Sequence, residues 1–282
     1  MNILTFDVEE WFHLLDNDST KTEREWMNYE VRIHENMDRI FSLLSRTDTK
    51  ATFFCLGWIA ERYPEIVRKI VDLGYEIGSH TRMHQLIFEQ KPSQFENDLE
   101  YSIKTLEDIS GQKVKYFRAP GFSITERNKW AFEILHRHGI IIDCSVFPAL
   151  RSHGGFVSYS SPVPSIIRLN GIEIRELPIS YFSLLNTPII FSGGGYFRLY
   201  PYHLIKRWSK QSSYIMSYFH PRDFDSEQPI IESLTFLRKF KSYVGLKGAE
   251  FKLERWLTDY NFVDINYANG LIDWSVVPIV KL

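Results

Sequence analysis

The sequence predicts an α/β fold in which parallel strands alternate with covering helices. Short apolar runs alternate with amphipathic stretches through the first 145 residues or so, which is the pattern of repeated strand–helix units. The composition, 44% apolar and 24% charged, is typical of a globular protein. Such a repeat closes as a barrel or forms an open doubly wound sheet, and in both the site lies at the carboxyl ends of the strands.

The first half of the chain is expected to contain five strands, at residues 3–8, 51–56, 75–78, 116–118 and 140–143. Between them, apolar residues recur at helical spacing and predict three helices. Their core-facing residues are Ile33, Met37, Ile40, Phe41 and Leu44; then Ile66, Ile70 and Val71, with Pro64 in the first turn; then Phe95, Leu99, Ile103 and Leu106. Ser93 and Glu96 form a capping-box signature for the third helix.

The second half has a different pattern, rich in Pro, Ser and Gly. Residues 148–200 are expected to form a β-rich insertion with short strands at 165–169, 172–178 and 189–191. A helix at 201–210, a strand at 214–219, a helix at 230–243, a last helix at 256–260 and a last strand at 262–265 follow. A length of 282 residues favours one large domain over 1–282, with the barrel at about 1–224 and a C-terminal extension at about 225–282.

Charge and cysteine content limit the partners and the compartment. Lys and Arg total 33 and Asp and Glu total 35, a net charge of −2 that favours neither nucleic acid nor an anionic membrane surface as partner. Cys55 and Cys144 lie in apolar segments and suit a reducing compartment as buried free thiols. With no basic leader and no run of 18 apolar residues, the expectation is a cytoplasmic protein without membrane insertion.

Carboxylates follow the first predicted strand. Asp7 and Glu9 are two residues apart, so their side chains project to the same face, whereas Glu10 projects to the other. Two carboxylates that close repel each other unless a cation or a shared proton lies between them. The pair therefore indicates either a site for a cation or a solvated acidic strand end.

His80 and His84 follow the third predicted strand. One turn beyond a strand end, both imidazoles can face the place to which Asp7 and Glu9 point. Two histidines and one carboxylate form the ligand set of an open catalytic zinc site. Such a metal lowers the pKa of its bound water and so supplies hydroxide at neutral pH. The second carboxylate is then free to act as a base.

Further polar residues end other predicted strands. Arg118 can clamp a carboxylate with two parallel hydrogen bonds, and the turn at Pro120 and Gly121 can direct backbone N–H groups inward, as an oxyanion needs. An ordinary turn with a surface arginine is the alternative. Asp143 and His220 end two more strands and offer an imidazole with a carboxylate partner, although a structural role is the alternative for His220.

Taken together and in order, five of these segments resemble the motifs of the polysaccharide deacetylases, the NodB-homology family of carbohydrate esterases (family 4). The segments are Thr5-Phe6-Asp7-Val8-Glu9, His80-Thr81-Arg82-Met83-His84, Arg118-Ala119-Pro120-Gly121-Phe122, the stretch that begins Asp143-Cys144-Ser145, and Tyr218-Phe219-His220. The resemblance implies a distorted (β/α) barrel and the hydrolysis of an acetyl group, more readily N-acetyl than O-acetyl, from a sugar.

The resemblance also implies roles for individual residues. Asp7 matches the catalytic base, Arg118 the residue that holds the base, and His220 the general acid. Asp143 matches the carboxylate that tunes the general acid, and the N–H of Gly121 matches the oxyanion donor.

The metal ligands implied by the resemblance are His80, His84 and a carboxylate. The usual adjacent Asp-Asp of the first motif is replaced by Asp7-Val8-Glu9. Glu9 is therefore assigned as the third ligand, with Glu10 as the alternative. The implied cofactor is a divalent metal, zinc by this ligand set.

Three more segments resemble the branch of the family linked to exopolysaccharide and surface-glycan synthesis: residues 7–13, residues 192–198 and residues 219–221. The glycine triplet in residues 192–198 indicates either a tight turn or a loop that lets a sugar approach the backbone, with Arg198 reaching an anionic group. His13 is a further candidate for substrate contact. The expected partner is an acetylated sugar or glycan precursor. A cyclic amide or ureide hydrolase of the same superfamily and an inactive glycan-binding barrel are the alternatives.

Overall fold

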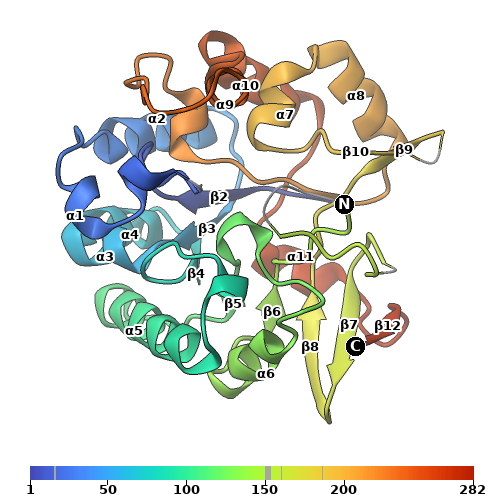
Figure 1. The fold of residues 1–282 in the computed structure, drawn as a ribbon. Helices are drawn as coiled ribbons and strands as arrows, with labels where there is room; N and C mark the ends of the chain where they lie inside the picture. The colour runs from blue at the N-terminus through green and yellow to red at the C-terminus, as the bar shows by residue number, and fades with distance from the viewer. Residues whose placement is uncertain (16, 150–153, 160, 186) are drawn as a thin grey trace. The chain divides into compact units, whose positions relative to one another are not determined.

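The computed structural model describes residues 1–15, 17–149, 154–159, 161–185 and 187–282 (Figure 1). The chain divides into two compact units, each built from two segments. Unit 1 contains Met1–Ala51 and Tyr181–Val263, and unit 2 contains Thr52–Ser180 and Asp264–Leu282. The predicted single domain over the whole chain stays a prediction.

Unit 2 contains the strands β3 (Thr52–Cys55), β4 (Glu76–Ser79), β5 (Tyr116–Phe117), β6 (Ile142–Asp143), β7 (Ser165–Leu169), β8 (Ile172–Glu176) and β12 (Ile279–Lys281). β3, β4, β5, β6 and β8 pair in this order, all parallel. β7 then pairs antiparallel with β8 and parallel with β12. Because the strands β3 to β6 are parallel, their carboxyl ends lie at one edge, and the predicted α/β class is confirmed.

The helices of unit 2 are α3 (Gly57–Arg62), α4 (Pro64–Asp72), α5 (Pro92–Ser110), α6 (Trp130–Arg137) and α11 (Ile265–Leu271), with 3₁₀ turns η2 (Ile87–Glu89) and η3 (Pro120–Phe122). Figure 1 shows α3 to α6 along the outer side of β3 to β6. The predicted apolar face of α5 is buried. The predicted cap is wrong, because α5 begins at Pro92 and the Gln94 side chain accepts a hydrogen bond from the Lys91 N–H at 2.9 Å.

Unit 1 contains the strands β1 (Asn2–Ile3), β2 (Thr5–Val8), β9 (Phe182–Leu184), β10 (Thr187–Ile189) and β11 (Ile215–Met216). β1 pairs parallel with β11, and a parallel bridge joins Phe6 to Phe219 just beyond β11. Between these two stretches, the Asp7 N–H donates to the Phe219 carbonyl at 2.8 Å. The first strand region and the region that precedes His220 therefore run side by side and end at the same edge.

The helices of unit 1 are α1 (Glu23–Trp26), α2 (Ile33–Arg46), α7 (Gly194–Leu199), α8 (Tyr202–Gln211), α9 (Phe236–Tyr243) and α10 (Ala249–Asp259), with 3₁₀ turns η1 (Asp18–Thr20), η4 (Pro221–Phe224) and η5 (Leu246–Gly248). The five apolar residues predicted to face the core from α2 are all buried. In the part of the chain that the structure describes, no helix combines the length and the apolar character that crossing a bilayer requires.

Two predictions concern the C-terminal half; that of an insertion stays a prediction, and that of a last strand does not hold. The predicted insertion at 148–200 is divided between the units, with β7 and β8 in the sheet of unit 2 and the β9–β10 hairpin in unit 1; residues 150–153, 160 and 186 lie outside the described residues. The strand predicted at 262–265 is wrong. Val263 makes only an isolated bridge, and the Asp264 carboxylate caps α11 by accepting a hydrogen bond from the Tyr267 N–H at 2.7 Å.

Candidate active site

Unit 1 brings Asp7, Glu9 and His220 together. The Nε2 atom of His220 lies 3.4 Å from Oε1 of Glu9 and 3.8 Å from Oδ2 of Asp7. Asp7 and Glu9 are both buried, as expected of neighbouring side chains on one face of the strand region, whereas 24% of the His220 side chain is exposed. Both predicted strand ends therefore contribute to one group of titratable atoms.

The other ring nitrogen of His220 contacts Asp223, in the turn η4. The Nδ1 atom of His220 lies 3.1 Å from Oδ2 of Asp223, which also accepts the His220 backbone N–H at 2.9 Å. Burial disfavours the charged ring, but the carboxylates of Glu9, Asp223 and Asp7 outweigh it and raise the pKa of His220 to about 9. Sequence reasoning missed Asp223, although its position three residues after His220 suits a side chain that closes a turn.

Glu10 and His13 have structural partners. Oε1 of Glu10 accepts the backbone N–H groups of Arg32 and Ile33 at 2.8 and 2.9 Å, so the carboxylate lies at the N-terminus of α2. His13 is buried, and its Nδ1 accepts the Glu10 N–H at 3.2 Å. Of the two candidate ligands, Glu9 is therefore the one beside His220, whereas Glu10 binds the N-terminus of α2.

Unit 2 brings His80 and His84 together after β4. Their ring centroids lie 5.3 Å apart, and both residues are buried. Nδ1 of His80 lies 2.8 Å from the carbonyl oxygen of Arg118, which can only accept a hydrogen bond. In the neutral ring the proton is therefore on Nδ1 and the lone pair is on Nε2, the arrangement of a metal-binding histidine whose other nitrogen is hydrogen-bonded to the protein.

The loop between the two histidines is held by Asp98 from α5. Its carboxylate accepts the backbone N–H of Arg82 at 2.6 Å and that of Met83 at 3.1 Å. His84 itself has a positive φ of 53°, a conformation that needs such support in a residue with a side chain. Asp98 is a residue that sequence reasoning missed, since it lies 14 residues beyond His84 on a helix.

The donor types of Glu9, His80 and His84 suit a divalent metal. Each of the three is buried, and each offers one ligand atom, a carboxylate oxygen or an imidazole nitrogen. A buried carboxylate is costly unless a cation or hydrogen-bond donors balance its charge. The tautomer of His80 leaves its Nε2 lone pair available, so the chemistry of this donor set fits a metal such as zinc.

We expect Asp98→Ala to weaken zinc binding about 10- to 100-fold, because the Arg82 and Met83 N–H groups lose the acceptor that shapes the loop. Competition against a chromophoric chelator measures this affinity. Asp108→Ala, an exposed change on the same helix, is the matched control and should bind zinc like the parent. An Asp98→Ala protein with parental zinc affinity would show that the loop does not depend on this carboxylate.

Arg118 is completely buried at the end of β5. Its Nε donates to the Cys144 carbonyl at 3.3 Å, and its guanidinium carbon lies 4.3 Å from the centre of the Phe54 ring. The alternative of a surface arginine is therefore wrong. The role in holding Asp7, a residue of unit 1, stays a prediction.

Asp143 organises the turn that follows Arg118. Its carboxylate accepts the Ser145 hydroxyl at 2.6 Å and the Ser145 N–H at 3.1 Å, and the Ser145 oxygen in turn accepts the Ala119 N–H at 2.8 Å. Gly121 has a positive φ of 60°, which favours glycine at this point of the turn. The carboxylate beside Nδ1 of His220 is that of Asp223. The tuning role of Asp143 and the oxyanion role of Gly121 stay predictions.

Asp143 and Glu176 form a buried acidic pair on the adjacent strands β6 and β8. Burial and the charge of Asp143 raise the pKa of Glu176 well above its ordinary range. Glu176 is a third residue that sequence reasoning missed.

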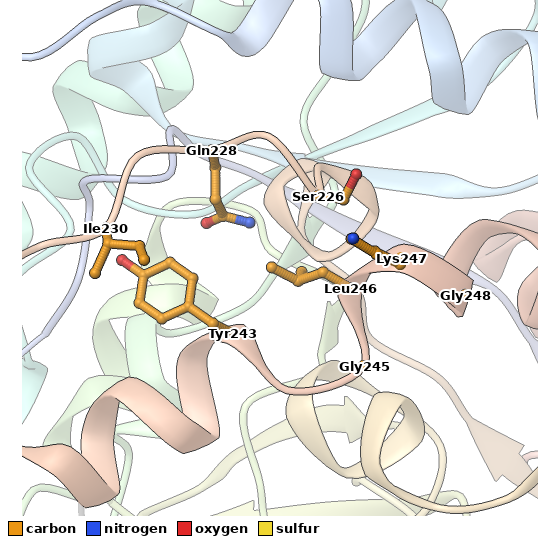
Figure 2. A pocket seen from close by; sticks show the side chains of 8 residues that line it. All are labelled: Ser226, Gln228, Ile230, Tyr243, Gly245, Leu246, Lys247 and Gly248. Carbon is orange, nitrogen blue, oxygen red and sulfur yellow. The ribbon is translucent and has the colours of Figure 1, made fainter.

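A separate cavity of about 430 Å³ lies in unit 1 (Figure 2). It is lined by Ser226, Gln228, Ile230, Tyr243, Gly245, Leu246, Lys247 and Gly248. The amide nitrogen of Gln228 donates to the carbonyls of Arg222 and Asp225 at 2.7 and 2.8 Å, which fixes its orientation. None of the predicted site residues lines this cavity.

Comparison with known proteins is consistent with this geometry. Parallel strands with carboxylates and histidines at their carboxyl ends define an α/β protein with a candidate hydrolase site. More narrowly, residues 17–140 match the polysaccharide deacetylase family, and residues 144–269 match a domain of unknown function, DUF3473. The resemblance to the polysaccharide deacetylases is therefore confirmed for residues 17–140, which include the motifs at residues 80–84 and 118–122 but not those at residues 5–9, 143–145 and 218–220. The exopolysaccharide branch stays a prediction.

Several curated relatives match part of the chain. A peptidoglycan-N-acetylglucosamine deacetylase of Bacillus cereus is 34% identical over 96 residues, which cover 34% of this chain and 35% of that protein. A chitooligosaccharide deacetylase of Azorhizobium caulinodans is 32% identical over 98 residues, which cover 34% of this chain and 44% of that protein. The chain thus spans less than half the length of these relatives.

Solved structures share the fold. A crystal structure described as a polysaccharide deacetylase from Mycobacterium smegmatis has a TM-score of 0.67 at 16% identity, with 99% of this chain and 92% of that chain covered. A peptidoglycan N-acetylglucosamine deacetylase structure has a TM-score of 0.51 at 18% identity, with 94% and 86% covered. At these identities, the likeness supports the predicted fold class and no finer property.

Proposed function

We propose that this protein hydrolyses the N-acetyl group of an acetylated sugar and releases acetate. The observation that carries the proposal is the group of two carboxylates around Nε2 of His220, at 3.4 Å from Glu9 and 3.8 Å from Asp7. Amide hydrolysis needs a proton acceptor for the attacking water and a proton donor for the departing nitrogen. A carboxylate and an imidazolium that lie side by side supply the proton acceptor and the proton donor.

Glu9, His80 and His84 are the ligands we propose for a divalent metal, with zinc as its identity. This assignment rests on the buried donor set and on the Nδ1–H tautomer of His80. When bound, such a metal supplies Lewis-acid polarisation of the acetyl carbonyl and of water. In this proposal the carboxylate of unit 1 and the histidines of unit 2 belong to one site.

The remaining roles follow the chemistry of each group. Asp7 takes a proton from water as the water oxygen forms a bond to the acetyl carbon. The Gly121 N–H donates to the oxyanion that develops on the carbonyl oxygen. His220 then gives its proton to the sugar nitrogen as the carbon–nitrogen bond breaks, which leaves acetate and a free amine. Arg118 holds Asp7 in position.

The substrate we propose is an N-acetylated oligosaccharide or surface-glycan precursor. The support is that the matched relatives are named for peptidoglycan N-acetylglucosamine and for chitooligosaccharides. An N-acetyl group is the common feature of these names. We further propose that the reaction takes place in the cytoplasm, on the ground that the two buried cysteines are free thiols.

The test is acetate release from chitooligosaccharides, peptidoglycan fragments and O-acetylated sugars, together with metal analysis of the purified protein. We expect acetate from an N-acetylated sugar, loss of activity on chelation and recovery on addition of zinc. Ring opening of a cyclic ureide without acetate release would favour the cyclic-amide alternative. Glycan binding without hydrolysis, in a protein that holds no metal, would favour an inactive binding barrel.

A further inference from the structure

We propose that Arg198 is a positioning residue for the proton donor of this site. Arg198 holds Asp223, and Asp223 holds the ring of His220 with a proton on Nδ1 and with Nε2 directed toward Asp7 and Glu9. The catalytic meaning of this chain of contacts rests on the proposed function. The chain of contacts itself lies entirely within unit 1.

Asp223 is the middle member of this series of contacts, because its two oxygens have different partners. Oδ2 faces His220, at 3.1 Å from the ring Nδ1 and 2.9 Å from the backbone nitrogen. Oδ1 lies 3.0 Å from Nε of Arg198. The arginine charge and the His220 contacts overcome burial and lower the pKa of Asp223 to about 2. The carboxylate is ionised and can only accept, so Nδ1 of His220 is the donor.

Arg198 is itself held by backbone carbonyls. Nη1 donates to the Val244 carbonyl at 2.8 Å, and Nη2 donates to the Lys241 carbonyl at 3.3 Å. The side chain is 4% exposed and that of Asp223 is 3% exposed. The planar guanidinium therefore has a fixed direction, as its fork of donors permits. The anionic group that Arg198 reaches in the structure is the Asp223 side chain.

The glycine triplet permits the backbone path that places Arg198 beside Asp223. A Cβ atom on Gly193 would lie 2.1 Å from the Tyr218 carbonyl oxygen, and the Gly194 N–H donates to that same oxygen at 3.0 Å. The glycines thus let the backbone touch the strand region that ends at His220. Helix α7 starts immediately and places Arg198 one turn later, over the turn η4.

The opposite end of α7 is also fixed. Nζ of Lys252 donates to the carbonyls of Arg198 and Tyr200, both at 2.8 Å, and to that of Phe197 at 3.1 Å, so a positive charge caps the helix C-terminus. A Cβ on Gly245 would lie 2.5 Å from the Arg198 carbonyl oxygen, which leaves room only for glycine there. Both ends of this short helix are therefore anchored around Arg198.

A purely stabilising role does not account for this arrangement well. A buried ion pair often adds little to stability, because desolvation of both charges offsets their attraction. The Arg198–Asp223 pair also orients the titratable ring of His220, and this role depends on the charges of the pair. Because loss of Arg198 removes the charge that balances the buried Asp223 carboxylate, it should destabilise the fold as well as disturb the proton donor.

The experiment compares Arg198→Met, Arg198→Lys and the exposed same-helix control Leu199→Ala, with His220→Gln as reference. The first measurement is the one-bond ¹⁵N–¹H signal of histidine-labelled protein. A hydrogen bond from Nδ1 of His220 to a buried carboxylate slows exchange, and the signal is assigned by its absence in His220→Gln. The second measurement is kcat on an N-acetylated oligosaccharide and on an activated aryl acetate, whose leaving group needs no proton.

We expect Arg198→Met to lose the slow Nδ1–H signal and to lower kcat on the amide about 10- to 100-fold. Aryl acetate hydrolysis should fall far less, and Arg198→Lys should restore part of both properties because it keeps the charge. Leu199→Ala should match the parent. A retained signal in Arg198→Met, or equal losses on both substrates, overturns the proposal.

Asp223→Asn tests the same series of contacts if Arg198→Met does not fold. The guanidinium has only donors, so Arg198 should attract the amide oxygen and turn the NH₂ group toward His220. The Nδ1–H signal should then disappear, and its persistence overturns the proposal. A parent protein that shows the signal but releases no acetate contradicts the proposed function instead, so the two failures are distinguishable.

Discussion

His84→Ala is expected to abolish metal binding and acetate release together while the protein stays folded. His84 lies in the loop that follows β4 rather than in a strand or helix, so its truncation should leave the strands and helices in place. A site that loses one of three protein ligands loses most of its metal affinity, and with it the polarised water and carbonyl. Metal content after dialysis, circular dichroism and acetate release measure the three properties.

His136→Ala is the matched control for this change, because His136 is an exposed histidine of unit 2 on α6. It should keep the metal, the fold and the activity of the parent. Equal metal occupancy in His84→Ala and in the parent would remove His84 from the ligand set.

Asp7→Asn is expected to keep the metal and to lower kcat about 10²- to 10⁴-fold, the usual size of a general-base contribution. The amide has the shape of the carboxylate but is not a base at neutral pH. Since the backbone of Asp7 is hydrogen-bonded to Phe219, the strand should stay in place. Steady-state kinetics on an N-acetylated oligosaccharide, with metal analysis of the same preparation, provides the measurement.

Glu9→Gln is the matched comparison, because Glu9 is the neighbouring carboxylate beside Nε2 of His220. It should lose metal as well as activity. Metal lost in Asp7→Asn and retained in Glu9→Gln would mean that the base and the ligand are exchanged between these two residues.

Much of the fold could be predicted from apolar spacing. The five apolar residues marked on α2 and the four marked on α5 are buried, because a helix with one apolar stripe has one way to face a core. The short strands of unit 2 also lie close to their predicted places. The errors occur where local contacts decide: Gln94 rather than Glu96 caps α5, and Asp264 starts a helix where a strand was expected.

The alternation of a strand determined that Asp7 and Glu9 share a face and that Glu10 does not, since this follows from a period of two. Spacing likewise placed the two histidines in one loop. In contrast, the partners of each side chain depend on which segments meet in space. Asp223, Asp98 and Glu176 were missed because each is either far along the chain from the group it supports or on a different element.

By itself, the sequence determined the α/β class and the residues at the strand ends, because periodicity and burial are local properties of a chain. Only the tertiary structure decided that Nε2 of His220 lies beside Glu9 and Asp7 and that Arg198 contacts Asp223. The parallel pairing of β1 with β11 joins Ile3 to Met216, and α7 must then pack over the turn η4. The physical reason is that hydrogen bonds and ion pairs form between neighbours in space, and no spacing rule connects residues so far apart.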